Sequence, residues 1–502
     1  MLISNEIYAK LLDLFFNLSV NVAIEAHKYL NNNSNISGYL QYPIRDRIFD
    51  LLLSNPEEYQ HIDYVKYKII KYHLDDFPKD RIQYGAIFNG YGNKININEI
   101  QGYAELSQFI LETTEVCEIF FENGEAKNSD YKIKHMVSEI VERYLYNTSA
   151  TNETPDNLKE LILPYVIEKI NRYVNEQLYF DILVPICLAT FDEDKIVLSS
   201  TAEIVRIPDD IQKSRQQACN YESVNENWIA ACATHMLVLH GYYLKNEKYI
   251  SINYLTQNYN LYPLNEIDYV MAAIRIATGY NIGYNQIISK PIDWVDSTKA
   301  DLIPLYGAKS NFVNGNEIHK SWVALSIKLI SNDEIKKIQT LYNSILTINE
   351  SVKDKDNKKN NLLFALKRLN RCYLRVEEDD MVTDATIGLE ALLSGGTKGE
   401  ITYTISNRIP VVFSNGSELN YPIKECRTIM KKIYECRSII VHGGTMKENK
   451  RYHKIGDLKI DVMNASVNFL RQTLLFILNN PKYLDAKEFD KHIDDAILVD
   501  LI

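Results

Sequence analysis

A polar run two thirds of the way along the chain divides the sequence more sharply than any other feature. Residues 349–361, Asn-Glu-Ser-Val-Lys-Asp-Lys-Asp-Asn-Lys-Lys-Asn-Asn, contain a single apolar side chain. Such a segment cannot bury itself, so we expect an exposed linker there. The whole chain has 502 residues. Because a hydrophobic core stops growing beyond about 250 to 300 residues, two or three domains are expected.

The spacing of apolar residues changes along the chain and suggests three regions. Residues 1–175 have mainly helical spacing, with helices expected at 6–30, 106–121, 130–146 and 158–178. Residues 176–348 begin with short β-branched runs at 180–188, 195–199 and 203–208, which favour strands in a mixed α and β domain with a regulatory role. Helical spacing then returns in residues 362–502.

The C-terminal region reads as a compact helical bundle. Its expected helices span 361–376, 378–393, 422–442, 457–480 and 486–498. Asp457 is the expected N-cap of the fourth helix and Pro481 its stop. The fold class predicted for the whole chain is therefore mainly α, with a C-terminal helical bundle preceded by a larger mixed α and β region.

Composition limits the compartment and the cofactors. With 46% hydrophobic and 24% charged residues, the chain is globular. The seven cysteines are scattered without a C-x-x-C pair, so neither a disulfide framework nor a zinc site is indicated. The N-terminus lacks the pattern of a signal peptide, and apolar stretches such as 473–478 fall below the roughly 18 residues of a membrane span. A cytoplasmic protein without membrane attachment is expected.

Charge is distributed unevenly. The net charge of −11 argues against a protein that coats nucleic acid through a general positive field. Residues 421–460, however, carry ten Lys or Arg against four Asp or Glu. A phosphate-bearing partner is expected to meet the protein there, although a solvated helix face explains the charges equally well.

Two histidines in the middle region are spaced too widely for one helical face. His235 and His240 are five residues apart, and no acidic group in the nearby sequence completes a metal site. Both are therefore predicted to be packing residues.

Arg437 breaks the apolar pattern of its helix. Residues Ile423, Cys426, Met430, Ile433, Arg437 and Ile440 follow one another at steps of three or four. A guanidinium in such a stripe must be paired or must line a cleft, because burying a lone cation costs several kcal/mol. Arg437 is the best candidate for a functional residue that the residue pattern alone provides.

His442 follows Arg437 at the end of the same predicted helix. Gly443 and Gly444 come next and should terminate the helix. The carbonyl end of a helix attracts positive charge, which suits a histidine that exchanges protons. A simple capping role is the alternative.

Arg437-Ser-Ile-Ile-Val-His442 resembles the R-x(4–6)-H signature of HEPN domains. The surrounding segments 384–393 (Asp-Ala-Thr-Ile-Gly-Leu-Glu-Ala-Leu-Leu) and 400–408 (Glu-Ile-Thr-Tyr-Thr-Ile-Ser-Asn-Arg), together with the terminal His-Gly-Gly, are similar to the Apea-like branch of that family. The resemblance covers roughly residues 360–480.

The resemblance implies an endoribonuclease that uses neither a metal nor a cofactor. His442 would exchange the proton of a ribose 2′-hydroxyl or of the leaving 5′-oxygen, and Arg437 would hold the scissile phosphate. The products would carry 2′,3′-cyclic phosphate and 5′-hydroxyl ends. The expected substrate is RNA in single-stranded regions, with tRNA among the candidates.

The family also implies an oligomer and a biological setting. Two HEPN domains compose one cleft, so we expect a homodimer or a higher even-numbered oligomer, with Ile433 and Ile440 around the two-fold axis. The setting implied is a bacterial anti-phage or abortive-infection toxin that its N-terminal region restrains until a trigger, such as a phage-derived one, arrives.

Other residues are expected to support these two. Ser438 occupies the position after the arginine, where many relatives have Asn, Asp or His, and its hydroxyl could orient His442. Glu390 could pair with Arg437 or with Arg408. The expected phosphate contacts are Arg408, Arg427, Lys431 and Lys447. The rival hypothesis is a non-catalytic module that dimerises or binds RNA and uses Arg437 as an interface anchor.

Overall fold

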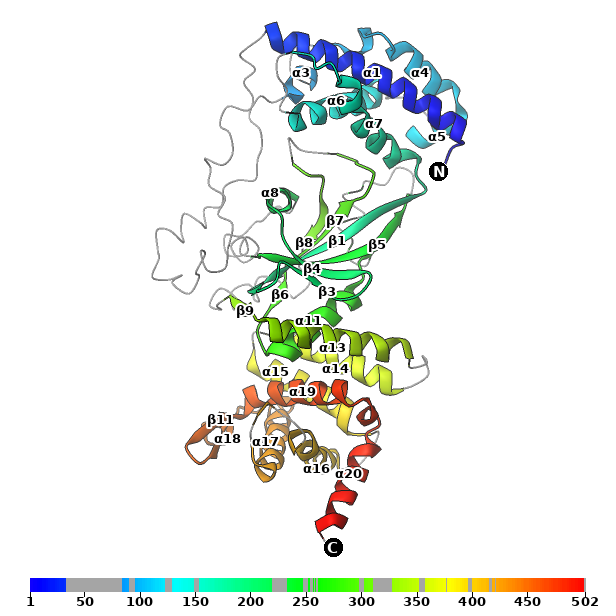
Figure 1. Ribbon diagram of the computed structural model, residues 1–502. Helices are drawn as coiled ribbons and strands as arrows, with labels where there is room; N and C mark the ends of the chain where they lie inside the picture. The colour runs from blue at the N-terminus through cyan, green and yellow to red at the C-terminus, as the bar shows by residue number, and fades with distance from the viewer. Residues whose placement is uncertain are drawn as a thin grey trace, which may run out of the picture.

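The computed structural model describes most of the chain. The described residues are 1–32, 84–89, 95–121, 129–148, 153–218, 233–246, 252, 256, 258, 261–297, 302–309, 327–351, 357–375, 377–395, 400–414, 418–419 and 421–500. As predicted, the fold is mainly helical with mixed sheets. Helical layers lie at the N-terminal end and the C-terminal end, with the main sheet between them (Figure 1).

The N-terminal helices form a layer with its own hydrophobic core. Its helices are α1 (Asn5–Asn32), α3 (Gly85–Asn89), α4 (Tyr103–Glu112), α5 (Thr114–Phe120), α6 (Ser129–Asn147) and α7 (Leu158–Val174). The helix expected at 106–121 is two helices, because the chain takes an extended conformation at Thr113. The helix expected at 158–178 ends at Val174, and the next residues enter the sheet.

Helix α1 is more apolar than the sequence reading allowed. Within the described residues, it is long and apolar enough to cross a membrane by length and composition. In this structure its apolar side chains, including Leu11, Phe15 and Leu18, are buried among α4, α6 and α7. The helix therefore serves here as the central element of the N-terminal core.

The middle of the molecule is a mainly antiparallel sheet with strand order β3-β4-β5-β1-β7-β8. Its strands are β1 (Gln177–Cys187), β3 (Lys195–Val197), β4 (Ala202–Arg206), β5 (His235–Lys245), β6 (Gly283–Tyr284), β7 (Gln286–Pro291) and β8 (Tyr306–Lys309). A separate parallel pair joins β2 (Ala189–Phe191) to β9 (Lys328–Ile330). Strands β1, β3 and β4 match the three runs predicted from the sequence.

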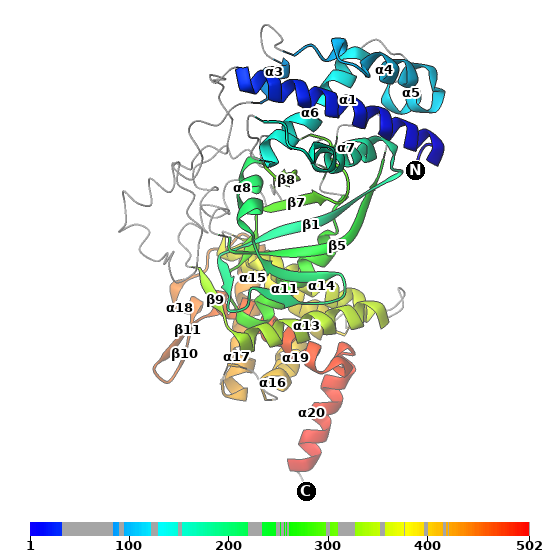
Figure 2. The ribbon, with the colours of Figure 1, turned by 45° about the horizontal axis from the view of Figure 1, so that its top comes forward.

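Two helices cover opposite faces of this sheet. Helix α8 (Asp209–Ala218) contributes Ile211 to a small cluster with Leu183, Met236 and Val238. Helix α11 (Leu264–Thr278) packs on the other face, toward the C-terminal part of the chain (Figure 2). Alternating side chains of β1 and β5 point to these two faces, as expected of a sheet buried on both sides.

The C-terminal part is the predicted helical bundle with additions. Its elements are α13 (Asn332–Ser351), α14 (Asn357–Cys372), α15 (Glu378–Leu393), α16 (Ile401–Ser414), α17 (Ile423–Val441), α18 (Glu448–Arg451), β10 (Tyr452–Ile455), β11 (Leu458–Asp461), α19 (Val462–Asn479), η5 (Pro481–Leu484) and α20 (Lys487–Asp500). Pro481 does follow the end of α19, as predicted. The N-cap of α19 is Asp461 rather than Asp457, because the Asp461 carboxylate accepts the Met463 backbone N–H at 2.9 Å.

The linker predicted at 349–361 is largely helical. Helix α13 continues to Ser351 and α14 begins at Asn357, so only residues 352–356 lie outside the described structure. Lys and Glu are good helix formers, and the exposed end turns of two helices need no apolar side chains. The polar run therefore connects two helices that pack into one core.

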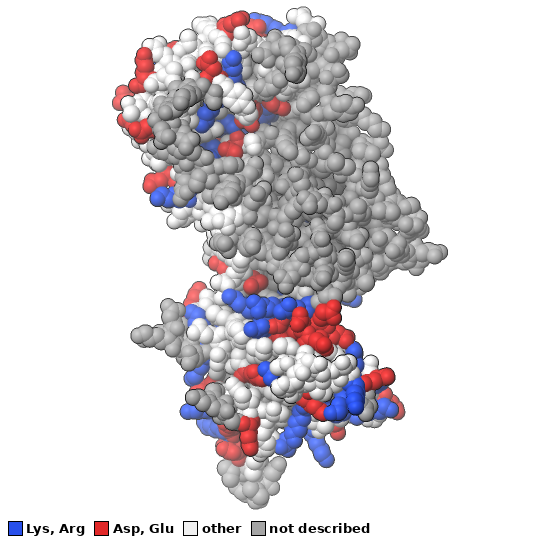
Figure 3. Space-filling view, turned by 180° about the vertical axis from the view of Figure 1, so that it is seen from behind, with Lys and Arg blue, Asp and Glu red and all other residues white. Residues whose placement is uncertain are grey.

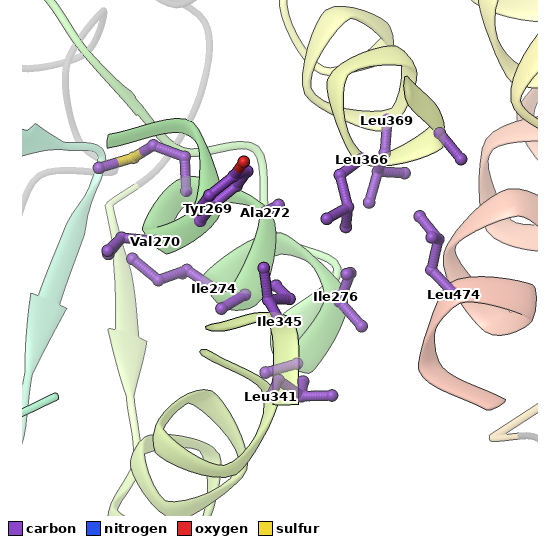
Figure 4. Packing of buried hydrophobic residues seen from close by; sticks show 14 of the residues in the cluster. Tyr269, Val270, Ala272, Ile274, Ile276, Leu341, Ile345, Leu366, Leu369 and Leu474 are labelled. Atoms are coloured by element: carbon purple, nitrogen blue, oxygen red, sulfur yellow. The ribbon is translucent and has the colours of Figure 1, made fainter. Parts of the chain in front are cut away.

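The sheet and the C-terminal bundle share that core. Helix α11 contacts α13, α14 and α19, and one buried cluster extends from Leu178 in the sheet to Phe489 in α20. Figure 4 shows Ile276 of α11 close to Leu366 and Leu369 of α14 and Leu474 of α19. Continuous apolar packing of this kind is typical of one rigid unit rather than of two domains joined by a hinge.

Two arginines reinforce this junction at the C-terminal end of α11. Arg275 is fully buried and donates to the Ile282 carbonyl and to Asn370 Oδ1 of α14, the latter at 2.7 Å. Arg471 of α19 donates from Nε to the Ile276 carbonyl at 3.0 Å and also bonds Glu418. The Ile276 carbonyl, one of the last four of α11, is thus satisfied from the bundle side.

The N-terminal layer meets the sheet through polar contacts instead. Arg172 of α7 donates to Asp296 Oδ1 at 2.9 Å and to Asn246 Oδ1 at 2.8 Å. Lys169 bonds both Glu139 and the Asp296 carbonyl. Because hydrogen bonds exchange with water at little net cost, this junction is easier to open than the apolar one below the sheet.

Glu142, near the same junction, gives the N-terminal layer a pH-dependent stability. Burial, and then the charge of Glu139, raise the pKa of Glu142 to about 7. A carboxyl with a raised pKa in the folded state stabilises the fold at low pH, and this stabilisation is lost as the pH rises through 7. We expect a loss on the order of 2 kcal/mol between pH 5 and pH 7.5, with allowance for partial solvent exposure.

Urea unfolding of the full chain at several pH values measures this effect. Glu142→Gln should reduce the dependence, whereas Glu160→Gln, on an exposed position of α7, should leave it unchanged. The part that remains comes from His135, because its hydrogen bond with Glu139 raises its pKa and also stabilises the fold at low pH. Lys132 does not mask the effect, because burial lowers its pKa only to about 8 and its contribution changes above the tested range. An equal pH dependence in wild type and Glu142→Gln would contradict the assignment.

Candidate active site

Helix α17 is anchored by one buried face. Cys426, Ile429, Met430, Ile433, Tyr434 and Cys436 are its buried residues. The helix ends at Val441, one residue before the predicted end. Gly443 follows in the left-handed region with φ of 72°, and its N–H donates to the Ile440 carbonyl at 2.9 Å. An L side chain is strained in that conformation, which explains the glycine after His442.

Arg437 lies at the edge of this buried face, as its place in the apolar stripe predicted. The residue is half-buried, and its Nε is buried without a hydrogen-bond partner. Within the described part of the chain, the guanidinium has no ion-pair partner either. A buried unpartnered N–H on a cation is costly, so Arg437 is poised for an anionic group that the chain itself does not supply.

Glu390 on α15 is near this arginine but pairs with a different residue. The Tyr434 hydroxyl donates to Glu390 Oε1 at 3.0 Å. Burial and the Glu390 charge raise the pKa of Tyr434, and the Arg437 charge opposes that shift, which places the three groups in one electrostatic neighbourhood. The predicted Glu390 pairing with Arg437 or Arg408 is therefore replaced by a Tyr434–Glu390 bond beside Arg437. The sequence reading missed Tyr434, although its position three residues before Arg437 puts it on the same side of the helix.

His442 and Ser438 are exposed at the C-terminal end of α17. The His442 backbone N–H donates to the Ser438 carbonyl at 3.2 Å, so both residues still follow the helical path. At 3.6 residues per turn, five residues turn the helix by about 140°, so Arg437 and His442 lie on different faces of α17. Arg437 and His442 therefore lie at the same end of the helix but do not contact each other.

A β-hairpin missed by the sequence reading runs beside α17. Lys450 of α18, just before the hairpin, bonds Glu435 at 2.5 Å, and His453 Nε2 of β10 bonds Glu425 at 2.7 Å. Arg451, at the base of the hairpin, bonds Asp461 and also Glu378 at the start of α15. These contacts fix the loop after His442 against the helix bundle.

The predicted phosphate contacts separate into two kinds. Arg427, Lys431 and Lys447 are exposed, as the prediction required. Arg408 is not available: it is buried, donates from Nε and Nη2 to Asp490 at 2.8 and 2.5 Å, and donates from Nη1 to the Leu393 carbonyl. It fixes α16 to α15 and α20, so its prediction as an RNA contact was wrong.

The predicted dimer surface also changes. Ile433 is fully buried inside its own bundle, so it cannot contact a second copy, and Ile440 packs partly against the same core. Ile423, placed in the apolar stripe, is 54% exposed, and Val441 is 51% exposed beside His442. The apolar surface near the motif is therefore at Val441 rather than at Ile433.

The two middle-region histidines differ from each other. His235 is buried, with Nδ1 bonded to Thr234 Oγ1 at 2.8 Å, which confirms a packing role. His240 instead lies between two carboxylates, with Nδ1 2.8 Å from Asp181 and Nε2 3.6 Å from Glu203. The sequence reading missed these acids because they come from neighbouring strands. Among the described residues, no group of three His, Cys, Asp or Glu is arranged to hold a metal ion.

The chain matches no protein-family model, no curated protein and no solved structure. The functional proposal therefore rests on the residues of the site alone.

Proposed function

We propose that the C-terminal bundle is a metal-independent endoribonuclease of the HEPN type, and that the chain acts as a bacterial anti-phage or abortive-infection toxin. The observation that carries the proposal is Arg437, a half-buried cation whose buried Nε has no partner, on a helix whose C-cap is an exposed histidine. A phosphate of RNA supplies the anion that this guanidinium lacks.

The reaction needs only proton transfers and charge stabilisation. A ribose 2′-oxygen attacks the adjacent phosphorus while its proton passes to an imidazole, and the bond from phosphorus to the 5′-oxygen breaks. A protonated imidazole gives its proton to that leaving oxygen. Arg437 offsets the negative charge that grows on the phosphate. The hydrogen bond between Tyr434 and Glu390 fixes these two side chains beside the Arg437 guanidinium. The products are a 2′,3′-cyclic phosphate and a 5′-hydroxyl.

One chain supplies one such motif, and two steps of the reaction need an imidazole. We propose a homodimer in which the C-terminal ends of two α17 helices meet, so that His442 of one copy works opposite Arg437 and His442 of the other. The exposed Val441 side chain is the apolar contact beside the motif. Isologous pairing is the commonest form of protein oligomer. The junction between the N-terminal layer and the sheet is polar and therefore easier to open. It is suited to a layer that restrains the nuclease until a trigger releases it.

Pairing and cleavage are tested together by Val441→Glu. We expect this chain to be a monomer by light scattering and to lose RNA cleavage, since a buried unpaired carboxylate opposes association. The matched control is Val197→Glu, an equally exposed valine on β3, which should remain dimeric and active. A wild-type monomer that cleaves RNA, or a Val441→Glu dimer with full activity, would contradict the composite site.

The non-catalytic module has one observation in its favour. Arg437 and His442 lie on different faces of α17, and a helix cap accounts for His442 without chemistry. Under that hypothesis the chain binds RNA or dimerises and leaves RNA intact, so the same cleavage assay separates the two.

A further inference from the structure

We propose that one exposed face of α17 is a track for a single strand of RNA leading to His442, and that Lys450 of α18, in the segment that follows His442, keeps this track open by neutralising Glu435 on it. The inference rests on the proposed ribonuclease function and names how its substrate is held. We define the α17 track as Lys424, Arg427, Lys431 and Ser438.

Helical geometry puts these residues in line with the histidine. Counting 3.6 residues per turn from His442, Lys424 falls at the same angle, Lys431 about 20° away, Ser438 about 40° away and Arg427 about 60° away. All four residues of the track are exposed. The line extends about 27 Å from Lys424 to His442 at 1.5 Å per residue. A row one side chain wide follows a single strand better than it fits a duplex.

The cations of the track are not engaged by the protein. Among the described residues, Lys424, Arg427 and Lys431 make no ion pair, whereas the neighbouring acids do. Figure 3 shows that, over the rear of the C-terminal part, Lys and Arg lie directly beside Asp and Glu. Ion pairs between neighbouring side chains, rather than the electrostatic field of the whole protein, therefore decide which cations can bind phosphates.

Lys450 of α18 neutralises the one charge that opposes the track. Glu435 lies about 20° from His442 by the same count, between Lys431 and Ser438. Its Oε1 is 2.5 Å from Lys450 Nζ, which is held by the loop and hairpin that follow His442. Glu425 lies about 100° from His442 by the same count, off the track, and His453 of β10 bonds it at 2.7 Å. Without Lys450, the Glu435 carboxylate would face the RNA backbone and repel it.

Binding of a fluorescent unstructured RNA oligonucleotide to the full-length His442→Ala chain, measured by anisotropy over a series of salt concentrations, tests the track. Replacing Lys424, Arg427 and Lys431 together by Gln should lower the slope of log Kd against log salt by about 2, since each phosphate contact with a single strand contributes roughly 0.7. Lys336→Gln and Lys482→Gln together, on α13 and η5, are the control and should leave the slope unchanged. An unchanged slope in the triple variant would overturn the track.

A rescue experiment separates neutralisation of Glu435 by Lys450 from direct contact of Lys450 with RNA. Lys450→Ala should weaken binding several-fold, and adding Glu435→Gln to it should restore the wild-type affinity, because the exposed carboxylate is then gone. No recovery in the double variant would show that Lys450 acts in another way and would overturn its proposed neutralising role. Cleavage of RNA by the wild-type chain is measured alongside. If the triple variant lowers the salt slope but the wild-type chain leaves RNA intact, the nuclease proposal is refuted. If the wild-type chain cleaves RNA but the triple variant leaves the salt slope unchanged, only the track is refuted.

Discussion

Replacing His442 by alanine is expected to lower the rate of RNA cleavage by about 10² to 10⁴, the range that a general acid or base contributes. The loss should appear in the rate at saturating RNA, because the imidazole acts on the reacting oxygens rather than on the bound strand. Stability should change little, since the side chain is exposed and the cap is made by backbone N–H groups of His442 and Gly443.

Single-turnover cleavage of a labelled RNA, with circular dichroism on the same samples, measures both quantities. His492→Ala is the matched control: His492 bonds Tyr483 at 2.9 Å on α20, away from the motif helix, and its loss should leave cleavage unchanged. Full activity in His442→Ala would show that the histidine is only a helix cap and would favour the non-catalytic module.

Asp384→Ala is expected to cost about 3 kcal/mol of folding free energy or more, because it breaks a buried ion pair and leaves its partner uncompensated. The carboxylate is 3% exposed and bonds Arg368 Nη1 at 2.5 Å and Arg375 Nε at 2.9 Å. Arg368 Nε is already buried without a partner, so removal of Asp384 leaves a mostly buried guanidinium with cation–π contact to Phe364 alone.

Urea unfolding followed by circular dichroism measures this loss. The control is Asp380→Ala, which removes a 57% exposed carboxylate that also bonds Arg375. Exposed pairs contribute at most about 1 kcal/mol. Equal midpoints for the two variants would contradict the assignment of Asp384 as the buried counter-charge between α14 and α15.

Local patterns in the sequence predicted the elements around the site well. The apolar spacing placed the helix of the motif within one residue of α17, and the arginine out of pattern is, with Arg368, one of two in the described residues whose buried Nε lacks a partner. The hairpin also had a local signal in the sequence, the pair Gly456-Asp457. This pair lies between the segments 452–455 and 458–461 that form the two strands, and Gly456 has a φ of 57°. The prediction of Asp457 as a helix N-cap overlooked this signal, because a Gly-Asp pair between two strands is typical of a tight hairpin turn.

Contacts between distant residues account for what the sequence could not provide. Arg408 and its partner Asp490 are 82 residues apart, so nothing local marks this arginine as structural. His240 finds Asp181 and Glu203 only through strand register. The burial of Ile433, which excludes it from a dimer contact, follows from packing of α17 on α15, α16 and α19. Periodicity identifies an apolar face but does not say whether its partner is the same chain or another copy.

Chelation, with analysis of the RNA ends, tests the central claim most directly. Purified wild-type chain is incubated with RNA in excess EDTA, and the 3′ ends of the products are identified. The account predicts unchanged cleavage that leaves 2′,3′-cyclic phosphate ends, because the chemistry needs only imidazole and guanidinium groups. Cleavage that stops in EDTA and returns with Mg²⁺ or Mn²⁺, leaving 3′-hydroxyl ends, would contradict it.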